Sequence, residues 1–257
     1  MKIGIFDSGL GGLSVLHAAM RLCPGAEYLY YADRAHVPYG SKSPAEVLGF
    51  VEDILRFLIA EGAEAIVIAC NTATSVAVAR MREIFSLPII GMEPAAKRAL
   101  DSYTSGRILV AATPITVRGE KMRLLLEKWD SESRVDLLAL PELVRLAEKG
   151  EFTGAEVENY LRECLRDFPT VNYCAFVLGC THFNYFKDTL RALLPPQVRL
   201  LDGIAGTLRH LMDCVAIPER PCGVPPRFFD SGTEVTAERL EEFERCLRRL
   251  DEMETIE

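Results

Sequence analysis

Hydrophobic residues along the chain form short continuous runs, and these alternate with segments in which apolar residues recur at helical spacing. The runs are typical of strands buried on both faces, and they occupy residues 2–6, 27–33, 65–69, 87–92, 107–112, 135–140, 175–179 and 198–202. Helix-like segments separate them. One begins with the capping box Ser43-Pro44-Ala45-Glu46, and its apolar face holds Val47, Val51, Ile54, Leu55 and Leu58. The alternation predicts an α/β protein with mostly parallel sheets flanked by helices.

The C-terminal part of the sequence has two further patterns. Residues 236–250 predict an amphipathic surface helix with no assigned chemistry, on whose apolar face lie Leu240, Phe243, Leu247 and Leu250. The segment before it, residues 214–229, is rich in cysteine and proline. It matches no motif, and we interpret it as variable surface.

Two segments far apart in the sequence resemble each other. Residues 66–74 (IVIACNTAT) and 176–184 (FVLGCTHFN) both read as a strand, a cysteine, a polar loop and the start of a helix. Any α/β protein repeats strand-loop-helix units, but that does not explain a cysteine at the same place in both. Because ligands of parallel sheets bind beyond the carboxyl ends of the strands, two such units facing each other would bring Cys70 and Cys180 to one cleft.

A glycine-rich loop follows the first predicted strand, in Phe6-Asp7-Ser8-Gly9-Leu10-Gly11-Gly12. It resembles a dinucleotide fingerprint with Ser14 in place of the last glycine, and Asp33 lies where a ribose-binding acid would fall. A carboxylate at Asp7 would repel a pyrophosphate at the helix start, which disfavours that interpretation. The alternative is that Asp7 and Ser8 face the cleft themselves, with the glycines letting the helix begin close to the sheet.

Composition limits the classes of function. The chain has 257 residues, 49% of them hydrophobic, with a formal net charge of -8 and a pI of about 5.2. An acidic surface repels phosphate backbones, so we expect no nucleic-acid partner. The N-terminus has no apolar run long enough for a signal peptide, and no window is apolar enough to span a membrane. We expect a cytoplasmic protein without a membrane partner.

The thiols carry the candidate chemistry. None of the eight cysteines forms a C-x-x-C pair or has metal-finger spacing, so we expect no metal and no disulfide framework. A thiol at the start of a helix has a pKa lowered from about 8.5 toward neutrality, where it can act as base or acid. One thiolate could remove a proton from a stereogenic carbon while the second thiol protonates the opposite face. No lysine stands in a Schiff-base motif, so no cofactor is expected.

Four motifs then carry a family resemblance: FDSGLGGLSV, YADRAHVPYGSKS, IACNTATS and LGCTHF. With them the chain resembles the glutamate racemases of the cofactor-independent aspartate/glutamate racemase superfamily, over residues of about 3 to 206. The resemblance implies two similar α/β lobes with the active site in the cleft between them. We expect the first lobe to hold residues 1–92 plus 207–257, and the second to hold residues 93–206.

The resemblance also implies roles for individual residues. Cys70 would take the α-proton from D-glutamate and Cys180 from L-glutamate, with Asp7 assisting the first thiol and His182 the second. Glu148 matches an acidic position near the second thiol. The implied substrate contacts are Asp7, Ser8, Pro38, Tyr39, Gly40, Asn71, Thr72, Thr113, Thr116, Thr181 and His182. By residue type alone, His182 could instead cap a helix, Tyr39 could pack in a turn, and Glu148 could be a solvated helix carboxylate.

The family further implies a homodimer that supplies D-glutamate for peptidoglycan synthesis. The chain lacks the N-terminal extension of precursor-activated members, so we expect no activation of that kind. Aspartate racemase is the nearest alternative, because a difference of one methylene changes binding by only about 1–3 kcal/mol. A hydantoin racemase or a decarboxylase is a more distant alternative, since the decarboxylases keep one of the two cysteines. A binding role is the alternative from another class, since some glutamate racemases also inhibit DNA gyrase, but no motif here supports it.

Overall fold

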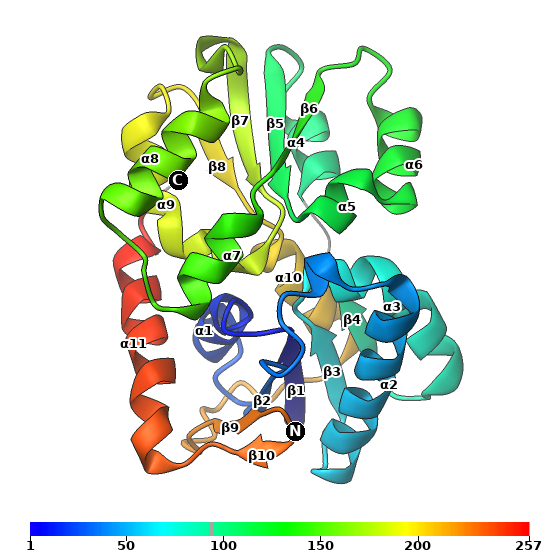
Figure 1. Cartoon of the computed structure of the whole chain (residues 1–257). Helices are drawn as coiled ribbons and strands as arrows, with labels where there is room; N and C mark the ends of the chain where they lie inside the picture. The colour runs from blue at the N-terminus through cyan, green and yellow to red at the C-terminus, as the bar shows by residue number, and fades with distance from the viewer. Residues whose placement is uncertain (93–94, 257) are drawn as a thin grey trace.

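The computed structural model describes residues 1–92 and 95–256, and it contains two sheets flanked by helices (Figure 1). The first sheet has the order β10-β9-β2-β1-β3-β4 and the second has the order β6-β5-β7-β8. All strand pairs are parallel except β9 with β10. The predicted α/β class with mostly parallel sheets is therefore confirmed.

The eight hydrophobic runs of the sequence form the eight strands from β1 to β8. In the first sheet the strands are β1 (Lys2–Asp7), β2 (Glu27–Ala32), β3 (Ala65–Ile68), β4 (Ile89–Gly91), β9 (Arg227–Asp230) and β10 (Thr233–Glu234). In the second they are β5 (Arg107–Ala112), β6 (Val135–Ala139), β7 (Tyr173–Leu178) and β8 (Arg199–Leu201). Central strands such as β1 and β3 are buried almost throughout, because helices cover both faces of a parallel sheet.

Helix α2 begins where the capping box in the sequence predicts. The Ser43 hydroxyl accepts a hydrogen bond from the Glu46 amide, and the Glu46 carboxylate accepts one from the Ser43 amide, so the capping box is confirmed. The helices are α1 (Leu13–Leu22), α2 (Pro44–Ala60), α3 (Asn71–Ile84), α4 (Ala96–Ser102), α5 (Pro114–Arg118), α6 (Glu120–Trp129), α7 (Pro141–Glu148), α8 (Ala155–Leu165), α9 (Lys187–Leu193), α10 (Ile204–Cys214) and α11 (Ala237–Met253), with 3₁₀ turns η1 (Tyr39–Ser41), η2 (Thr170–Asn172) and η3 (Thr181–Phe186).

The C-terminal segment contributes more than the sequence indicated. The stretch interpreted as variable surface ends in β9, which pairs in parallel with β2 and buries Phe228 and Phe229. Helix α11 packs against both α1 and η3, and Arg249 on it donates a hydrogen bond to the Tyr185 carbonyl at 3.0 Å. The amphipathic helix therefore joins α1, which follows a strand of the first sheet, to η3, which follows a strand of the second.

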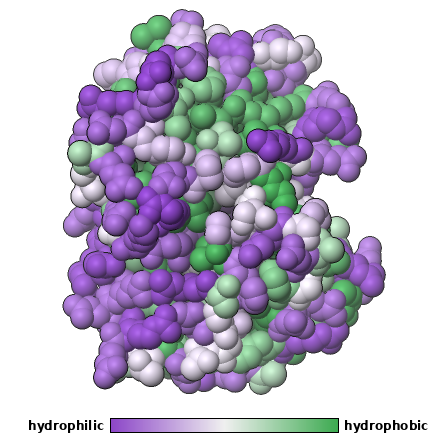
Figure 2. Space-filling view, viewed as in Figure 1, coloured by the Kyte–Doolittle hydropathy of each residue, from purple (hydrophilic) through white to green (hydrophobic). Residues whose placement is uncertain are grey.

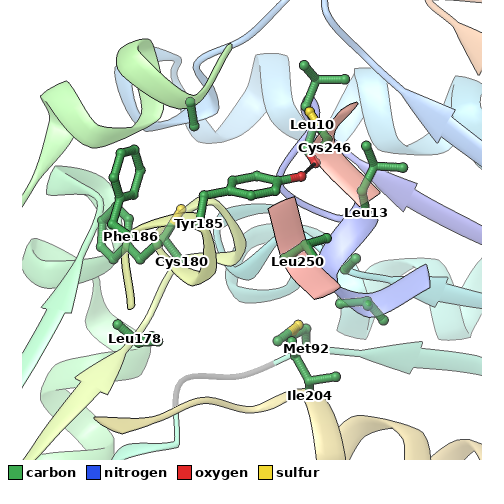
Figure 3. Packing of buried hydrophobic residues seen from close by; sticks show 14 of the residues in the cluster. Leu10, Leu13, Met92, Leu178, Cys180, Tyr185, Phe186, Ile204, Cys246 and Leu250 are labelled. Atoms are coloured by element: carbon green, nitrogen blue, oxygen red, sulfur yellow. Dashed lines mark hydrogen bonds between the residues drawn. The ribbon is translucent and has the colours of Figure 1, made fainter. Parts of the chain in front are cut away.

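The hydrophobic core is continuous between the two sheets near this helix. Figure 3 shows Leu10, in the loop before α1, beside Cys246 of α11, with Leu13 of α1 nearby and the Tyr185 ring extending from η3 toward them. On the outside, hydrophilic residues cover much of the face in Figure 2, and hydrophobic residues show mainly in its upper half. No helix in the described ranges is both long and apolar enough to cross a membrane.

The division into two lobes stays a prediction. Its first boundary falls at residues 93–94, which lie outside the described residues. Its second boundary, between residues 206 and 207, falls inside α10, a helix that contacts both α1 and β4. The two sheets themselves comprise residues 2–91 with 227–234, and residues 107–201.

Candidate active site

The carboxyl ends of β1, β3 and β7 converge on one pocket between the two sheets. Cys70 follows β3 as the N-cap of α3, and Cys180 follows β7 as the residue before η3. Both thiols line this small pocket, together with Ser8, Pro38, Tyr39, Gly40, Asn71, Thr72, Thr113, Val144, Thr181 and His182. The two cysteines therefore lie in one pocket, as the sequence predicts. Asp7, Thr116 and Glu148 lie just behind this lining.

Cys70 is held as the cap of its helix. Its Sγ accepts a hydrogen bond from the Ala73 amide at 3.4 Å, and its thiol donates to Ser8 Oγ at 3.7 Å. Burial raises the pKa of Cys70, and the nearby Asp7 and Cys180 raise it further, against the lowering by the Ala73 amide and Ser8. The expectation of a lowered pKa was therefore wrong for this thiol, because removal from water outweighs the helix start.

Cys180 has a different environment, made by a chain of side chains. Its Sγ lies 3.7 Å from His182 Nδ1, and His182 Nε2 lies 2.7 Å from Glu148 Oε1. It precedes a 3₁₀ turn, while α9 begins only at Lys187, so the predicted α-helix start at this thiol is wrong. An imidazole and a carboxylate therefore replace the helix as partners of the second thiol.

The His182–Glu148 contact is an ion pair. Burial alone would lower the pKa of His182, but its bonds to Cys180 and Glu148 raise that pKa well above its ordinary value. Burial alone would raise the pKa of Glu148, but the bonds from His182 and the Leu10 amide hold it below its ordinary value. Imidazolium and carboxylate are thus the stable forms, and the imidazolium can donate its Nδ1 proton toward Cys180.

Hydroxyl groups from both sheets meet at another wall of the pocket. Thr113 Oγ1 lies 3.0 Å from Thr72 Oγ1 and 3.1 Å from Thr116 Oγ1. Beside them Asn71 is buried, and both polar atoms of its side chain lack a hydrogen-bond partner in the described structure. Buried polar atoms are rarely left unpaired, so this wall is suited to a polar ligand. The pocket lining contains no lysine or arginine among the described residues.

A further feature of the described residues concerns metal ligands. In the ranges 1–92 and 95–256, no group of three or more His, Cys, Asp and Glu side chains is arranged to hold a metal ion. The polar side chains in and just behind the pocket lining are thiols, an imidazole, carboxylates, hydroxyls and one amide.

Comparison with known proteins identifies the family. The model of the Asp/Glu/Hydantoin racemase family matches residues 13–211. The glutamate racemase of Campylobacter curvus (strain 525.92) is 58% identical over 218 residues, which cover 82% of each chain. The chain belongs to the Asp/Glu/Hydantoin racemase family. It is an isomerase of the amino-acid racemase class, and the resemblance found in the sequence motifs is confirmed.

Solved structures of this racemase family share the fold over nearly the whole chain. Escherichia coli glutamate racemase, in complex with L-glutamate and the activator UDP-MurNAc-ala, has a TM-score of 0.83 and 29% identity, covering 97% of this chain and 94% of its own. Glutamate racemase from Francisella tularensis subsp. tularensis SCHU S4, in complex with D-glutamate, has a TM-score of 0.79 and 28% identity, covering 96% and 93%.

The glycine loop of this racemase serves its own acid-base groups. The amides of Gly9 and Gly12 donate to Asp7 Oδ2 at 3.2 and 3.0 Å, and the Leu10 amide donates to Glu148 Oε1 at 2.6 Å. The Gly11 amide points at His182 Nε2 from 3.2 Å. These amides are the groups that would hold a pyrophosphate, so the dinucleotide interpretation is wrong.

The acid that would bind ribose in that interpretation also has other partners. Asp33 accepts a hydrogen bond from the Tyr39 hydroxyl at 2.5 Å and contacts His36 Nδ1 at 2.8 Å. It thereby fixes the ring of Tyr39 in the pocket wall. Asp7, predicted to assist Cys70, makes its side-chain bond to Thr181 Oγ1 at 3.3 Å, and its charge acts on Cys70 through space.

Several residues at the site carried no signal in the sequence analysis. Tyr30 and Tyr185 donate their hydroxyl protons to the carbonyls of Gly9 and Leu10, at 2.7 and 2.6 Å, and so fix the glycine loop from the other side. Val144 lines the pocket one helical turn before Glu148 on α7, a spacing that could have linked the two.

Proposed function

We propose that this racemase interconverts L- and D-glutamate by a two-base reaction without a cofactor, in which Cys70 and Cys180 act on opposite faces of the α-carbon. The observation that carries the proposal is the position of the two buried thiols, which reach one pocket from separate sheets. A substrate between them has one thiol on each side. Enantiomers require proton transfer on opposite faces, and this arrangement provides it.

The proposed reaction moves one proton in each half. In the direction from L-glutamate, the Cys180 thiolate takes the α-proton, so the C–H bond breaks and an S–H bond forms. The carbanion then takes a proton from the Cys70 thiol on its other face and becomes D-glutamate. The reverse reaction begins with Cys70. Assignment of each thiol to its enantiomer follows the family resemblance.

The different surroundings of the thiols suit these starting states. The raised pKa of Cys70 favours its protonated form, which is the form that donates. The His182 imidazolium faces Cys180 and would stabilise the thiolate that accepts. We infer that the reaction from L-glutamate starts with an acid on the Cys70 side and a base on the Cys180 side. Asp7, buried and with its pKa raised by burial, adds its influence on the Cys70 side.

Hydroxyl and amide groups would bind the substrate carboxylates. Asn71, Thr72 and Thr113 supply donors on one wall, and Ser8 and Thr181 lie near the thiols. Preorganised neutral donors of this kind stabilise negative charge that develops next to a carboxylate. Pro38, Tyr39, Gly40, Thr116 and Glu148 complete the proposed set as pocket wall or as support behind it.

Glutamate is favoured over aspartate by the relatives. The Escherichia coli and Francisella tularensis proteins that share this fold bind L- and D-glutamate, and the Campylobacter curvus relative is named for the same substrate. We further propose that the product D-glutamate supplies peptidoglycan synthesis in the cytoplasm. The free state of all eight thiols fits a reducing compartment. A homodimer stays a prediction of the family resemblance.

The test is solvent deuterium incorporation into each enantiomer of glutamate, followed by circular dichroism and mass spectrometry with no added cofactor. Wild type should lose optical rotation while gaining one α-deuterium, and Cys70→Ser and Cys180→Ser should each lose nearly all racemisation. Cys214→Ser is the matched control, because Cys214 is an exposed thiol on α10. Exchange from aspartate alone would move the substrate, and full activity in either active-site variant would refute the two-thiol reaction.

A further inference from the structure

We propose that Arg34 is a positioning residue for the acid-base group of the second thiol: it holds Glu148, and through it His182, in place beside Cys180. The inference rests on the proposed two-thiol reaction. Arg34 follows β2 and lies outside the pocket lining, so it would touch neither substrate nor thiol. It acts through contacts that join three separate parts of the fold.

The first step concerns the two oxygens of Glu148. Oε1 receives the Leu10 amide at 2.6 Å and His182 Nε2 at 2.7 Å. Oε2 is buried and lacks a hydrogen bond within the described structure, and its contact is an ion pair with Arg34 Nε at 3.3 Å. Arg34 therefore supplies the positive charge on the side of the carboxylate that faces away from His182.

The second step concerns what fixes Arg34. Its Nη1 and Nη2 atoms donate to Glu242 on α11 at 2.7 and 2.9 Å, a two-pronged contact that sets the plane of the guanidinium. Asp230 at the end of β9 lies 3.7 Å from Nη1. With both terminal nitrogens engaged by Glu242, Nε points to Glu148. A lysine carries one point charge and cannot bind both carboxylates in this way.

The third step follows from where these residues come from. Arg34, Asp230 and Glu242 belong to elements on the first sheet or its C-terminal helix, whereas Glu148 ends α7 between strands of the second sheet. The ion pair thus spans the two halves directly behind His182. Fixing Glu148 fixes the ring that faces Cys180, because a buried imidazole takes its orientation from the partner of its far nitrogen.

Removal of Arg34 should also alter the pH dependence. Its charge is one of the influences that keep the pKa of Glu148 low, so the carboxylate would become protonated at higher pH without it. A protonated Glu148 no longer supports the imidazolium. The titratable and charged groups around Glu148 come from each packed element: Asp7 on β1, Tyr30 on β2, Arg34 after β2, His182 and Tyr185 on η3, and Glu242 and Cys246 on α11.

The experiment compares Arg34→Gln and Arg34→Lys with Arg227→Gln in the full chain. Arg227 is a matched control, because it makes a similar two-pronged contact with Glu234 and has no contact with the pocket. The measurement is kcat/KM for L- and D-glutamate against pH, with circular dichroism and melting temperature to verify folding. Arg34→Gln should move the acidic limb to higher pH by about one unit and lower kcat/KM about tenfold below the midpoint.

In Arg34→Gln, kcat/KM should fall equally for L- and D-glutamate, since enantiomers have equal free energies. The substrate deuterium isotope effect should nevertheless grow with L-glutamate, whose proton Cys180 would take. Arg34→Lys should recover part of the pH shift, and Arg227→Gln should match wild type. A folded Arg34→Gln protein with the wild-type pH profile would overturn the role of Arg34.

A second measurement does not depend on activity. Nitrogen NMR of the His182 ring, assigned by comparison with His182→Gln, should change in Arg34→Gln and stay unchanged in Arg227→Gln. Unchanged His182 signals in Arg34→Gln would also overturn the inference. Absence of glutamate racemisation in wild type, or full activity in Cys180→Ser, would instead refute the proposed function, so the two failures are distinguishable.

Discussion

Substitution of Gly11 by alanine tests the packing of the glycine loop against the second thiol's partner. A Cβ at this position would lie 2.3 Å from His182 Nδ1 and 2.6 Å from Thr181 Oγ1. Ordinary contacts begin at 3.4 Å, so the imidazole nitrogen must retreat by about 1.1 Å. Misplacement by about 1 Å can cost about 100-fold in rate. We therefore expect Gly11→Ala to lower kcat/KM by about that factor.

The free energy of unfolding should fall as well, by about 1–3 kcal/mol, because the added methyl overfills a packed site. The assay is the loss of circular dichroism from pure L- or D-glutamate, with urea unfolding measured on the same sample. Gly49→Ala is the control, since Gly49 is exposed on α2 with no atom within 4 Å of the new methyl. It should keep full activity and gain about 1 kcal/mol of helix stability. Wild-type kcat/KM in Gly11→Ala would refute the steric reasoning.

Two further changes probe other parts of the site. Thr113→Val keeps the shape of the side chain but removes the hydroxyl that contacts Thr72 and Thr116. The KM for glutamate in steady-state kinetics should therefore rise about tenfold. An unchanged KM would argue against carboxylate binding at this wall. Glu148→Gln should lower the free energy of unfolding by about 3 kcal/mol. That loss should be largest between pH 4.5 and 6.5, where both groups stabilise the folded protein. The lowered pKa of Glu148 adds stability that is complete above pH 4.5 and is lost as the pH falls below it. The raised pKa of His182 adds stability that is complete below pH 6.5 and is lost as the pH rises above it. Urea unfolding at several pH values checks this, and a loss that does not vary with pH would contradict the ion pair.

The sequence allowed prediction of the strands and of the two thiols at strand ends. Hydrophobic runs alone located β1 to β8, because strands buried on both faces leave a continuous apolar signal. The cysteine after each of two such runs then predicted that Cys70 and Cys180 would meet, since carboxyl ends of parallel strands share an edge. Both inferences use only local pattern and one rule of sheet geometry.

Other features depend on burial and on distant contacts, which local pattern does not contain. The sequence did not reveal that the pKa of Cys70 is raised, because the strength of desolvation depends on neighbours from other elements. The segment ending in Phe228 and Phe229 offered too short an apolar run to reveal that it extends the first sheet. Arg34 lies within the motif YADRAHVPYGSKS, but its partner Glu148 is more than a hundred residues away in the sequence.

The position of β9 has a consequence for the order in which the protein forms during synthesis. All strands of the second sheet lie between residues 107 and 201, so that sheet can assemble as soon as this stretch has left the ribosome. The outer edge of β2, in contrast, has no partner until β9 (Arg227–Asp230) is made. For that interval the nascent chain exposes an unpaired strand edge, which is a site for wrong pairing between chains. The first sheet, whose strands β1 to β4 are synthesised before any strand of the second sheet, is thus the last to be completed.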